Sequence, residues 1–454
     1  MAATGNSLGA MAPDRLRVAL LVYRGNPHSG GQGVYTRYLA RELVGLGHEV
    51  TVFAGQPWPV LDEGTGLVGV PSLDLYRQPD PFRLPRISEL RSAADLAELA
   101  IMCSGGFPEP RTFSWRVRRV LAGQRGRWDV LHDNQTFGSG MLDLMAEGWP
   151  MLGTCHHPIT VDRALELRHA GTWRRSLSLR RWYGFVEMQK RVARRMPRIV
   201  TVSESSRRDI VEQMGIEPAR LSVVPIGVDH ERFRPRPEVA VVPGRIMTTT
   251  SSDVPLKGLV PLLEALAELR LEHPGAHLVV VGRFREEGPV PRVLARLGLD
   301  RGAVRFVQGV SDAELVQLYA EAEVAVVPSL YEGFSLPAVE AMAMGTPLVA
   351  TTGGALPEVV GDDGVAGLLV PPGDPGALSG AIGKVLADRQ LGARLATEGR
   401  RRVLERFTWR AAAVATAQLY RELIDRSTPG AAAPARRHLG RHSPARLAAG
   451  ARRC

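Results

Sequence analysis

The chain has 454 residues, enough for two domains, and its 44% hydrophobic content is that of a globular protein rather than a disordered one. No apolar run approaches the roughly 18 residues of a membrane-spanning helix. The formal net charge of +10 would fit nucleic-acid binding. However, seven arginines and no acidic residue lie in the segment 426–454, which is rich in alanine and proline. That segment cannot bury a core, and we expect it to be a disordered basic tail.

A second basic excess lies between Arg163 and Arg208, on expected helices, with thirteen lysines and arginines against three glutamates. Neither basic stretch is interleaved with aromatic residues in a recognisable nucleic-acid module, so we expect no nucleic-acid partner. The helices could instead contact an anionic membrane surface or form a solvated basic face.

The cysteines point to a reduced compartment. Cys103, Cys155 and Cys454 are too far apart in the sequence to form a metal-binding pattern. Residues 1–14 lack the charged, apolar and small-residue order of a signal peptide, and we expect them to be a flexible N-terminus. The sequence therefore predicts a cytoplasmic protein, which the basic helices could attach peripherally to the inner face of the membrane.

The first domain is expected to begin at residue 15 with a β-α-β unit. Residues 17–22 form a buried strand, a turn with Gly30 and Gly31 follows, and a helix leads to a second strand at 49–53. This order predicts a parallel sheet that binds ligands at the carboxyl ends of its strands. The glycines do not match G-x-G-x-x-G, and no acidic residue ends the second strand, which disfavours a dinucleotide-dependent oxidoreductase.

Two further strands of this domain are expected at 128–132 and 150–154. His156 and His157 follow the second strand, at the edge where such sheets hold their chemistry. The basic segment 161–196 is expected to be helical.

The end of the first domain is marked by a strand at 198–202 and by Ser203, a residue type that caps helices. The proline-rich segment 233–243 is typical of a linker. We therefore predict a first domain at 15–228 and a second at 229–408.

The second domain is organised around residues 331–342. A strand at 324–327 leads into this stretch, and a helix should begin near Leu336, with a proline tolerated in its first turn. Glu332 on the loop and Glu340 about one turn into the helix can face one ligand. The free amide groups at the start of such a helix suit a phosphate.

Three other features of the second half enter the prediction. Lys257 lies on a loop after the strand 245–250, and Gly353 and Gly354 form a turn before another helix. A final amphipathic helix, 409–425, is expected to cross back and pack on the first domain.

The order and spacing of these pieces resemble the family-four retaining glycosyltransferases, over about residues 15–425. The resemblance implies the GT-B architecture, in which two doubly wound, Rossmann-like α/β domains face a central cleft. The first domain would bind the acceptor and the second the sugar nucleotide. The matching pieces are P-I-G-V-D at 225–229, K-G at 257–258, E-G-F at 332–334 with E-A at 340–341, G-G at 353–354 with P-E at 357–358, and G-L-L-V at 367–370.

The resemblance implies roles for residues of the second domain. Glu332 would bind hydroxyls of the transferred sugar, and Glu340 would hold the ribose hydroxyls. Lys257 would place its positive charge on the leaving diphosphate. Backbone amides would face the diphosphate at Gly333, Phe334, Ser335 and Leu336.

It also implies roles in the first domain. Gly30 and Gly31 would let the backbone approach the donor closely. His156 would hydrogen-bond the sugar near the reacting carbon, with His157 pointing to the other side. Asp229 is expected to cap a helix or hold the linker rather than to act as a catalytic acid.

One position departs from the family pattern. The family normally carries an arginine, preceded by glycine, five or six residues before the lysine, where this chain has Ser251 and Ser252. Half of the expected diphosphate clamp is therefore missing. Our hypothesis is that Arg283, at the carboxyl end of another strand of the same domain, replaces the lost charge.

The predicted reaction transfers a hexose, with retained configuration, from UDP- or GDP-hexose to a hydroxyl of a lipid, glycan or small metabolite. No Asp-x-Asp motif stands where a divalent ion would be needed, and we expect no metal and no cofactor. Two alternatives stay open, a sugar-nucleotide epimerase of the same architecture and a non-catalytic sugar-nucleotide-binding protein. The acceptor, the nucleotide base and the linkage leave no interpretable sequence motif.

Overall fold

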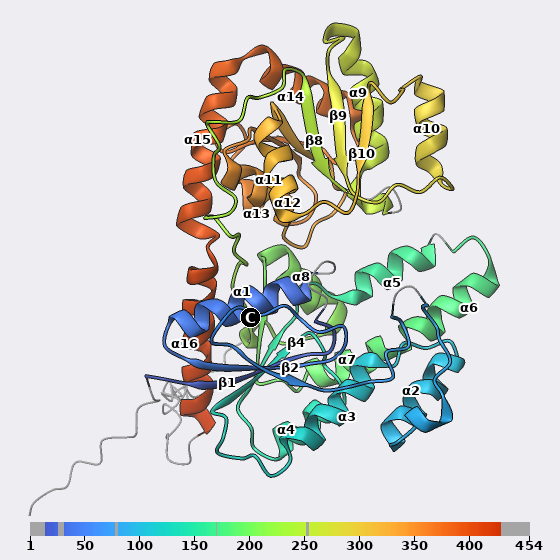
Figure 1. Cartoon of the computed structure of the whole chain (residues 1–454), viewed down its shortest axis with the longest axis vertical. Helices are drawn as coiled ribbons and strands as arrows, with labels where there is room; N and C mark the ends of the chain where they lie inside the picture. The colour runs from blue at the N-terminus through green and yellow to red at the C-terminus, as the bar shows by residue number, and fades with distance from the viewer. Residues whose placement is uncertain (1–13, 26–30, 78–79, 169, 251–253, 428–454) are drawn as a thin grey trace, which may run out of the picture.

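The computed structural model describes residues 14–25, 31–77, 80–168, 170–250 and 254–427, which form two α/β domains stacked along the long axis of the molecule (Figure 1). Predictions for residues 1–13, for the tail from 428 onward, and for Gly30, Ser251 and Ser252 lie outside these residues. No helix in the described ranges is long and apolar enough to span a membrane.

The first domain is built on a seven-stranded parallel sheet in the order β3-β2-β1-β4-β5-β6-β7. Its central strands are apolar and buried because helices cover both faces of the sheet. The strands are β1 (Arg17–Val22), β2 (Glu49–Ala54), β3 (Gly66–Gly69), β4 (Val130–Asn134), β5 (Met151–Thr154), β6 (Arg198–Thr201) and β7 (Leu221–Val223). The helices are α1 (Gln32–Gly45), α2 (Ala93–Cys103), α3 (Glu109–Leu121), α4 (Gly140–Ala146), α5 (Ile159–Arg168), α6 (Trp173–Trp182), α7 (Val186–Ala193) and α8 (Glu204–Met214).

The second domain has a six-stranded parallel sheet in the order β10-β9-β8-β11-β12-β13. Its strands are β8 (Arg245–Thr249), β9 (His277–Val281), β10 (Val304–Val307), β11 (Val324–Val327), β12 (Leu348–Thr351) and β13 (Leu368–Val370). Its helices are α9 (Leu259–Glu272), α10 (Pro289–Leu297), α11 (Asp312–Glu321), α12 (Leu336–Met344), α13 (Leu356–Val360), α14 (Pro375–Ala387) and α15 (Arg389–Arg406), with a 3₁₀ turn, η4, at Pro255–Lys257.

Local signals set several helix ends where the sequence predicts them. Ser203 begins α8, and its hydroxyl accepts a hydrogen bond from the Ser206 amide at 3.0 Å. The helix after the central stretch begins at Leu336, and Gly345 ends it in the left-handed conformation (φ 69°).

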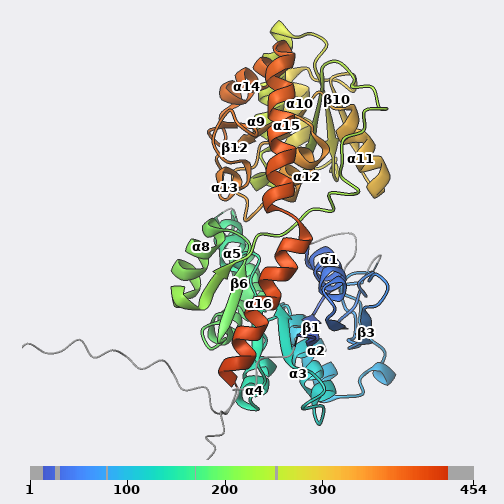
Figure 2. The ribbon, with the colours of Figure 1, turned by 90° about the vertical axis from the view of Figure 1, so that its left-hand side faces the viewer.

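The last helix, α16 (Trp409–Ser427), descends from the second domain along the first (Figure 2). Trp409 stacks on Tyr38 of α1 with ring centroids 5.4 Å apart. Further down the helix, the Tyr420 hydroxyl lies 2.6 Å from Nδ1 of the buried His132 in β4. One hydrophobic cluster thus runs from the first sheet through α16 into the second domain.

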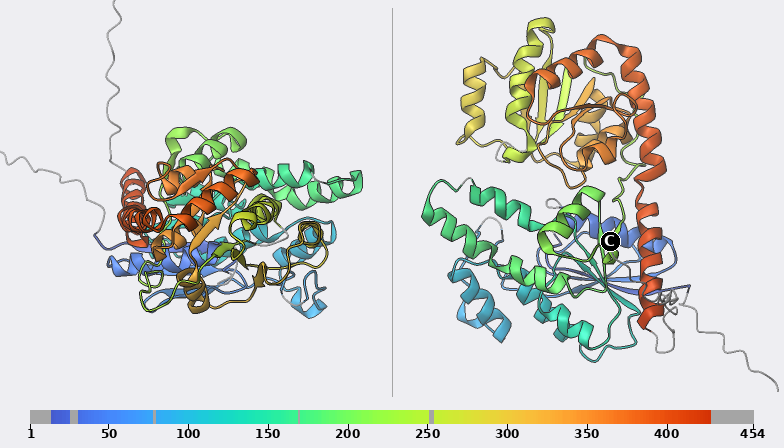
Figure 3. Two further views of the ribbon diagram at one scale, coloured as in Figure 1. Left: turned by 90° about the horizontal axis from the view of Figure 1, so that it is seen from above. Right: turned by 180° about the vertical axis from the view of Figure 1, so that it is seen from behind.

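The segment 161–196, predicted to be helical, forms three helices with breaks between them. Gly171 adopts a left-handed conformation (φ 65°) between α5 and α6, and Thr172 then caps α6 by accepting from the Arg175 amide. A 3₁₀ turn at Tyr183–Phe185 separates α6 from α7. As a result α5 and α6 project from the first domain as an arm, seen in Figure 1 and from above and behind in Figure 3.

Candidate functional site

A cavity of about 370 Å³ lies between the two domains. Its walls follow β5 in the first domain and β11 in the second, so the carboxyl ends of strands from both sheets meet there, as in other doubly wound folds. Residues that line it include Gly31, Gln32, Gln135, His156, His157 and Asp162 of the first domain, Lys257, Glu332, Gly333, Phe334 and Leu336 of the second, and Trp409 of α16.

Glu332 is buried on the loop between β11 and α12, with 8% of its surface exposed. Lys257 Nζ donates hydrogen bonds to both of its carboxylate oxygens, at 2.8 and 3.0 Å. The Ser329 hydroxyl donates a third, at 2.7 Å. The ion pair joins residues 75 positions apart in the chain and holds both charges at the cavity wall.

Two glycines place this loop. Gly258, which follows Lys257, has a φ of 68°, and a Cβ there would lie 1.9 Å from the carbonyl oxygen of Pro328. Gly354 has a φ of 63°, and a Cβ there would lie 2.2 Å from the carbonyl oxygen of Glu332. Both positions require glycine because the backbones approach so closely.

The start of α12 faces the cavity with Gly333, Phe334 and Leu336. Ser335 caps the helix with a positive φ of 95°, which is uncommon for a non-glycine residue and is typical of functional sites. Pro337 has no amide hydrogen, and the Ala338 amide donates to the Ser335 hydroxyl at 3.4 Å. The predicted diphosphate contact would therefore use the amides that precede Pro337, at Phe334, Ser335 and Leu336.

Glu340 lies beside the main cavity rather than in it. It lines an adjoining cavity of about 170 Å³, which shares Val34, Leu336 and Trp409 with the first. Burial raises the pKa of Glu340 to about 7, and the hydrogen bond that the Tyr319 hydroxyl donates at 3.1 Å opposes this effect. The two predicted carboxylates thus line two adjoining compartments.

His156 lines the cavity from the first domain. It is held by the last residue of β4 and by the residue that follows it. Asn134 Oδ1 lies 2.8 Å from His156 Nε2, and Gln135 Oε1 accepts from the His156 amide at 2.8 Å. Asn134 Nδ2 donates to Thr36 Oγ1 at 3.0 Å, which turns its Oδ1 toward the histidine. His156 Nε2 therefore carries the proton, and Nδ1 is left as a hydrogen-bond acceptor.

Burial lowers the pKa of His156 to about 4, and the neighbouring His157 lowers it further in the same direction. The imidazole is therefore neutral near pH 7. Neither Asn134 nor Gln135 was singled out from the sequence, although both lie just after a strand predicted at 128–132. The signal that could have found them is their position at the carboxyl edge of the sheet.

The structure also places two other residues that the sequence singled out. His157 does not point away, because it lines the same cavity as His156. Arg283 follows β9 but is exposed and lines neither cavity. Its role as a replacement for the missing arginine stays a prediction.

If Arg283 does supply the missing charge, replacing it with alanine should weaken donor binding several-fold and slow turnover, because a phosphate contact would be lost. Donor titration and initial rates would measure both. Unchanged donor affinity and turnover would end the idea.

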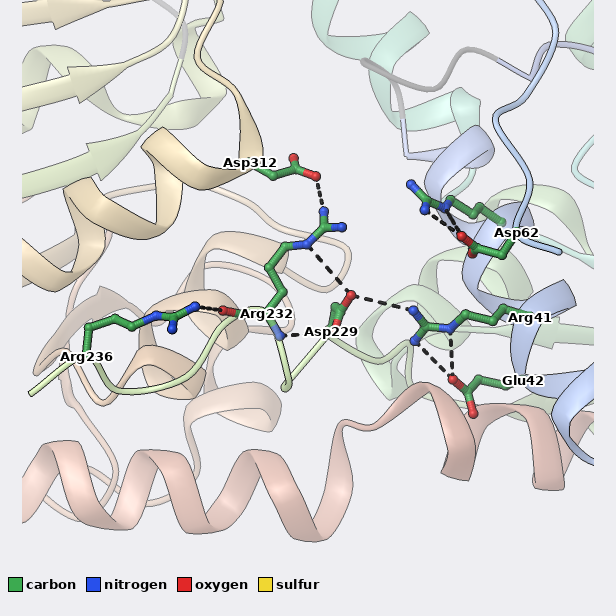
Figure 4. Close-up of polar contacts among 8 residues, drawn as sticks. Arg41, Glu42, Asp62, Asp229, Arg232, Arg236 and Asp312 are labelled. Atoms are coloured by element: carbon green, nitrogen blue, oxygen red, sulfur yellow. Dashed lines mark hydrogen bonds and ion pairs between the residues drawn. The ribbon is translucent and has the colours of Figure 1, made fainter.

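A chain of ion pairs crosses the domain boundary near Glu340 (Figure 4). Asp229 lies in the linker, with its Oδ2 3.6 Å from Nη1 of Arg41 in α1 and 3.9 Å from Nε of Arg232. Its Oδ1 also accepts a hydrogen bond from the Arg232 backbone amide at 3.2 Å. Arg232 in turn contacts Asp312 at the start of α11. Asp229 therefore holds the linker, as the sequence predicts, and helps to set the relative position of the domains.

Glu109, in the first turn of α3, is a buried carboxylate that the sequence did not indicate. Its Oε2 lies 3.6 Å from Arg24 and has no hydrogen-bond partner. Burial raises the pKa of Glu109 to about 8, while Arg24 opposes the rise. At about 1.4 kcal/mol per pKa unit, this shift corresponds to a few kcal/mol.

The sign of this shift predicts how stability depends on pH. A carboxylate with a raised folded-state pKa stabilises the fold at low pH, and this contribution is lost as the pH rises through about 8. We expect Glu109→Gln to lose less thermal stability than the native chain between pH 5 and pH 9. Melting curves at both pH values would test this, with the surface variant Glu147→Gln as a control. Identical pH-dependent losses in the native chain and Glu109→Gln would contradict it.

A metal site is not evident in the part of the chain that the structure describes, since no group of three or more potential ligands occurs there. The expectation that no metal is needed therefore stays a prediction.

Two family models match the chain. Residues 243–388 match the family described as "Glycosyl transferases group 1", and residues 29–232 match "Glycosyltransferase Family 4". A curated relative, the MMP alpha-(1->4)-mannosyltransferase of Mycolicibacterium hassiacum, is 52% identical over 412 residues, covering 90% of this chain and 99% of the relative. The glycogen synthase of Mycobacterium tuberculosis is 30% identical, over 86% of this chain and 91% of its own.

Solved structures agree on the fold. The sucrose-phosphate synthase of Thermosynechococcus elongatus superposes with a TM-score of 0.67 at 24% identity, over 90% of this chain and 99% of that one. Anabaena HepE in complex with UDP-glucose gives 0.60 at 19% identity, over 88% and 98%. These structures confirm the expected GT-B architecture. The family matches and the 52% identical relative confirm the prediction of a hexose-transferring enzyme. The chain belongs to the group 1, family-four glycosyltransferases.

Proposed function

We propose that this enzyme transfers a mannosyl residue from UDP- or GDP-mannose to the 4-hydroxyl of an acceptor sugar, forming an α-(1→4) linkage. The support for mannosyl transfer is the relative that is 52% identical over nearly its whole length. The observation that carries the chemistry is the cavity in which the Lys257–Glu332 pair and the neutral His156 face one another from different domains. An α-linked product from an α-linked donor means that configuration is retained.

In the proposed reaction the bond between sugar C1 and a diphosphate oxygen breaks. The bond between C1 and the acceptor oxygen forms on the same face, and the acceptor proton passes to an oxygen of the leaving diphosphate. Negative charge grows on that diphosphate as the first bond breaks. Lys257 and the amide groups at the start of α12 would stabilise it.

His156 and Glu332 would orient the transferred sugar. Glu332 offers carboxylate oxygens to sugar hydroxyls, and Nδ1 of His156 can accept a hydrogen bond from another. A neutral imidazole suits this task, since it adds no charge beside the reacting carbon. Glu340, which lines the adjoining compartment, would bind the ribose, so the donor would lie across both cavities.

We further propose that no metal ion takes part, because Lys257 and the α12 amides already supply positive charge at the diphosphate position. Movement of the domains over the donor would exclude water and limit hydrolysis.

The first test is a binding and turnover screen of the pure protein against UDP- and GDP-hexoses, with methyl α-D-mannopyranoside as acceptor and Glu340→Ala as control. We expect transfer from one mannose nucleotide, with the new linkage identified by NMR. The rate should be insensitive to EDTA. Epimerised donor without transfer would favour the epimerase alternative, and binding without any turnover would favour a non-catalytic binder.

We also propose that the projecting arm of α5 and α6 lets the enzyme contact an anionic membrane. Trp173 at the start of α6 is 71% exposed, and Arg174 and Arg175 follow it. We expect sedimentation with anionic vesicles at low salt, and its loss at high salt and in Trp173→Ala. Absence of sedimentation at low salt would rule the membrane contact out.

A further inference from the structure

His157 and Asp162 form a hydrogen-bonded pair in the wall of the main cavity. His157 Nε2 lies 2.6 Å from Asp162 Oδ2, and the side chains are 30% and 38% exposed. Both residues line the cavity that holds Lys257 and Glu332. Neither is needed for the contacts with the donor described above.

The pair fixes which nitrogen of His157 carries a proton. An ionised carboxylate only accepts hydrogen bonds, so Nε2 donates to Asp162. Nδ1 is then left with a lone pair. No hydrogen bond to Nδ1 occurs among the residues that the structure describes, and this atom is able to accept one from a hydroxyl group.

The backbone around the pair is held firmly. Gln135 Nε2 donates to the His157 carbonyl at 3.0 Å. On the opposite domain, a Cβ on Gly333 would lie 3.3 Å from Cβ of His157, so the two domains touch at this point. The Ser206 hydroxyl donates to the Gly333 carbonyl at 3.1 Å and thereby supports the same contact.

Different parts of the two adjoining cavities would hold different parts of the substrates. Glu340, in the adjoining compartment beyond Leu336 and Trp409, marks the nucleoside end. The Lys257–Glu332 pair marks the middle, where the diphosphate and the transferred sugar would lie. Asp162, in the first turn of α5, and His157 line the cavity from the first domain, whereas Lys257 and Glu332 line it from the second, so the first-domain side beside the pair is left for the second substrate.

We propose that His157, oriented by Asp162, binds the acceptor sugar by accepting a hydrogen bond from one of its hydroxyl groups at Nδ1. The inference rests on the proposed function and names a part of its acceptor site. His157 would touch the substrate, and Asp162 would be a positioning residue. The ligand class is a neutral carbohydrate, because the pair presents hydrogen-bonding atoms rather than a cluster of positive charges.

The test compares acceptor KM, kcat and donor Kd in three variants, with methyl α-D-mannopyranoside as acceptor. We expect His157→Ala to raise acceptor KM about tenfold or more, as loss of one good hydrogen bond does. Donor Kd should stay within twofold. His157→Asn, whose amide oxygen can take the place of Nδ1, should recover part of the loss. Asp162→Asn should act like His157→Ala, since its amide can donate to Nε2 and move the proton to Nδ1.

Thr160→Val is the matched control. Thr160 lies in the same turn of α5, does not line the cavity and bonds Gln213. The Thr160→Val variant should leave acceptor KM unchanged. An unchanged acceptor KM in a folded His157→Ala, or an equal loss of donor affinity, would overturn the proposal. If the native enzyme binds donor but transfers mannose to no mannoside, the proposed function itself is contradicted, rather than the role of His157 alone.

Discussion

Replacing Lys257 with alanine is expected to lower kcat by about 10² to 10³, the usual cost of removing one group that stabilises charge in the transition state. Lys257 is the cation that faces Glu332 in the main cavity, with Nζ at 2.8 and 3.0 Å from its carboxylate oxygens. Its side chain remains 35% exposed, so Nζ can reach a diphosphate without leaving the cavity wall. Initial rates at saturating donor and acceptor would measure the loss.

The ion pair between Lys257 and Glu332 also predicts how the effects of replacing the two residues combine. Because Lys257 and Glu332 act as one ion pair, Lys257→Ala leaves a buried carboxylate without its counter-charge. The double variant Lys257→Ala/Glu332→Gln should therefore lose less activity than the sum of the two single effects. The exposed Lys384 on α14 supplies the control, and its alanine variant should match the native rate. Full turnover in Lys257→Ala would contradict the charge-stabilising role.

The second large effect is expected at Glu340. Glu340→Gln should weaken donor binding by about 10- to 100-fold, because a neutral amide replaces a carboxylate that accepts two hydroxyl hydrogen bonds. Burial holds the folded-state pKa of Glu340 near 7, so the carboxylate becomes protonated just below neutral pH. Donor affinity of the native enzyme should therefore fall as the pH drops below about 7, by up to about tenfold per unit.

Isothermal titration of donor between pH 5.5 and pH 8.5 would test both statements. Glu340→Gln should bind weakly with no such pH dependence, because its amide does not titrate. The exposed Glu272 at the end of α9 provides a control that should behave as the native chain. A pH-independent donor affinity in the native enzyme would show that the ribose contact does not depend on an ionised Glu340.

Several features could be read from single stretches of sequence because short-range physics decides them. Apolar runs of strand length predict β1 and β11, and a helix-breaking glycine, Gly345, ends α12 after β11. Ser203 caps α8 for the same local reason. By contrast, the sequence analysis did not locate the break inside the predicted helical segment 161–196, where a left-handed Gly171 and a cap at Thr172 separate α5 from α6.

The candidate site was predictable in part. His156 and Glu332 were located by residue type and position after a strand, and the structure brings them to one cavity. Asn134 was missed, because nothing in a strand-ending asparagine shows that it will meet a histidine 22 residues away. The direction of His157 was predicted wrongly, since side-chain orientation at a loop depends on what packs beside it.

By itself, the sequence determined the alternation of strands and helices, the two-domain division and the residue types available at each strand end, because these follow from propensity and periodicity along the chain. Only the tertiary structure decided that Lys257 pairs with Glu332, that Glu340 occupies a separate compartment, and that His157 meets Asp162 in the cavity. Such pairings, and the shifted pKa of Glu340, depend on which distant segments exclude water from one another. That exclusion is a property of packing in three dimensions rather than of order along the chain.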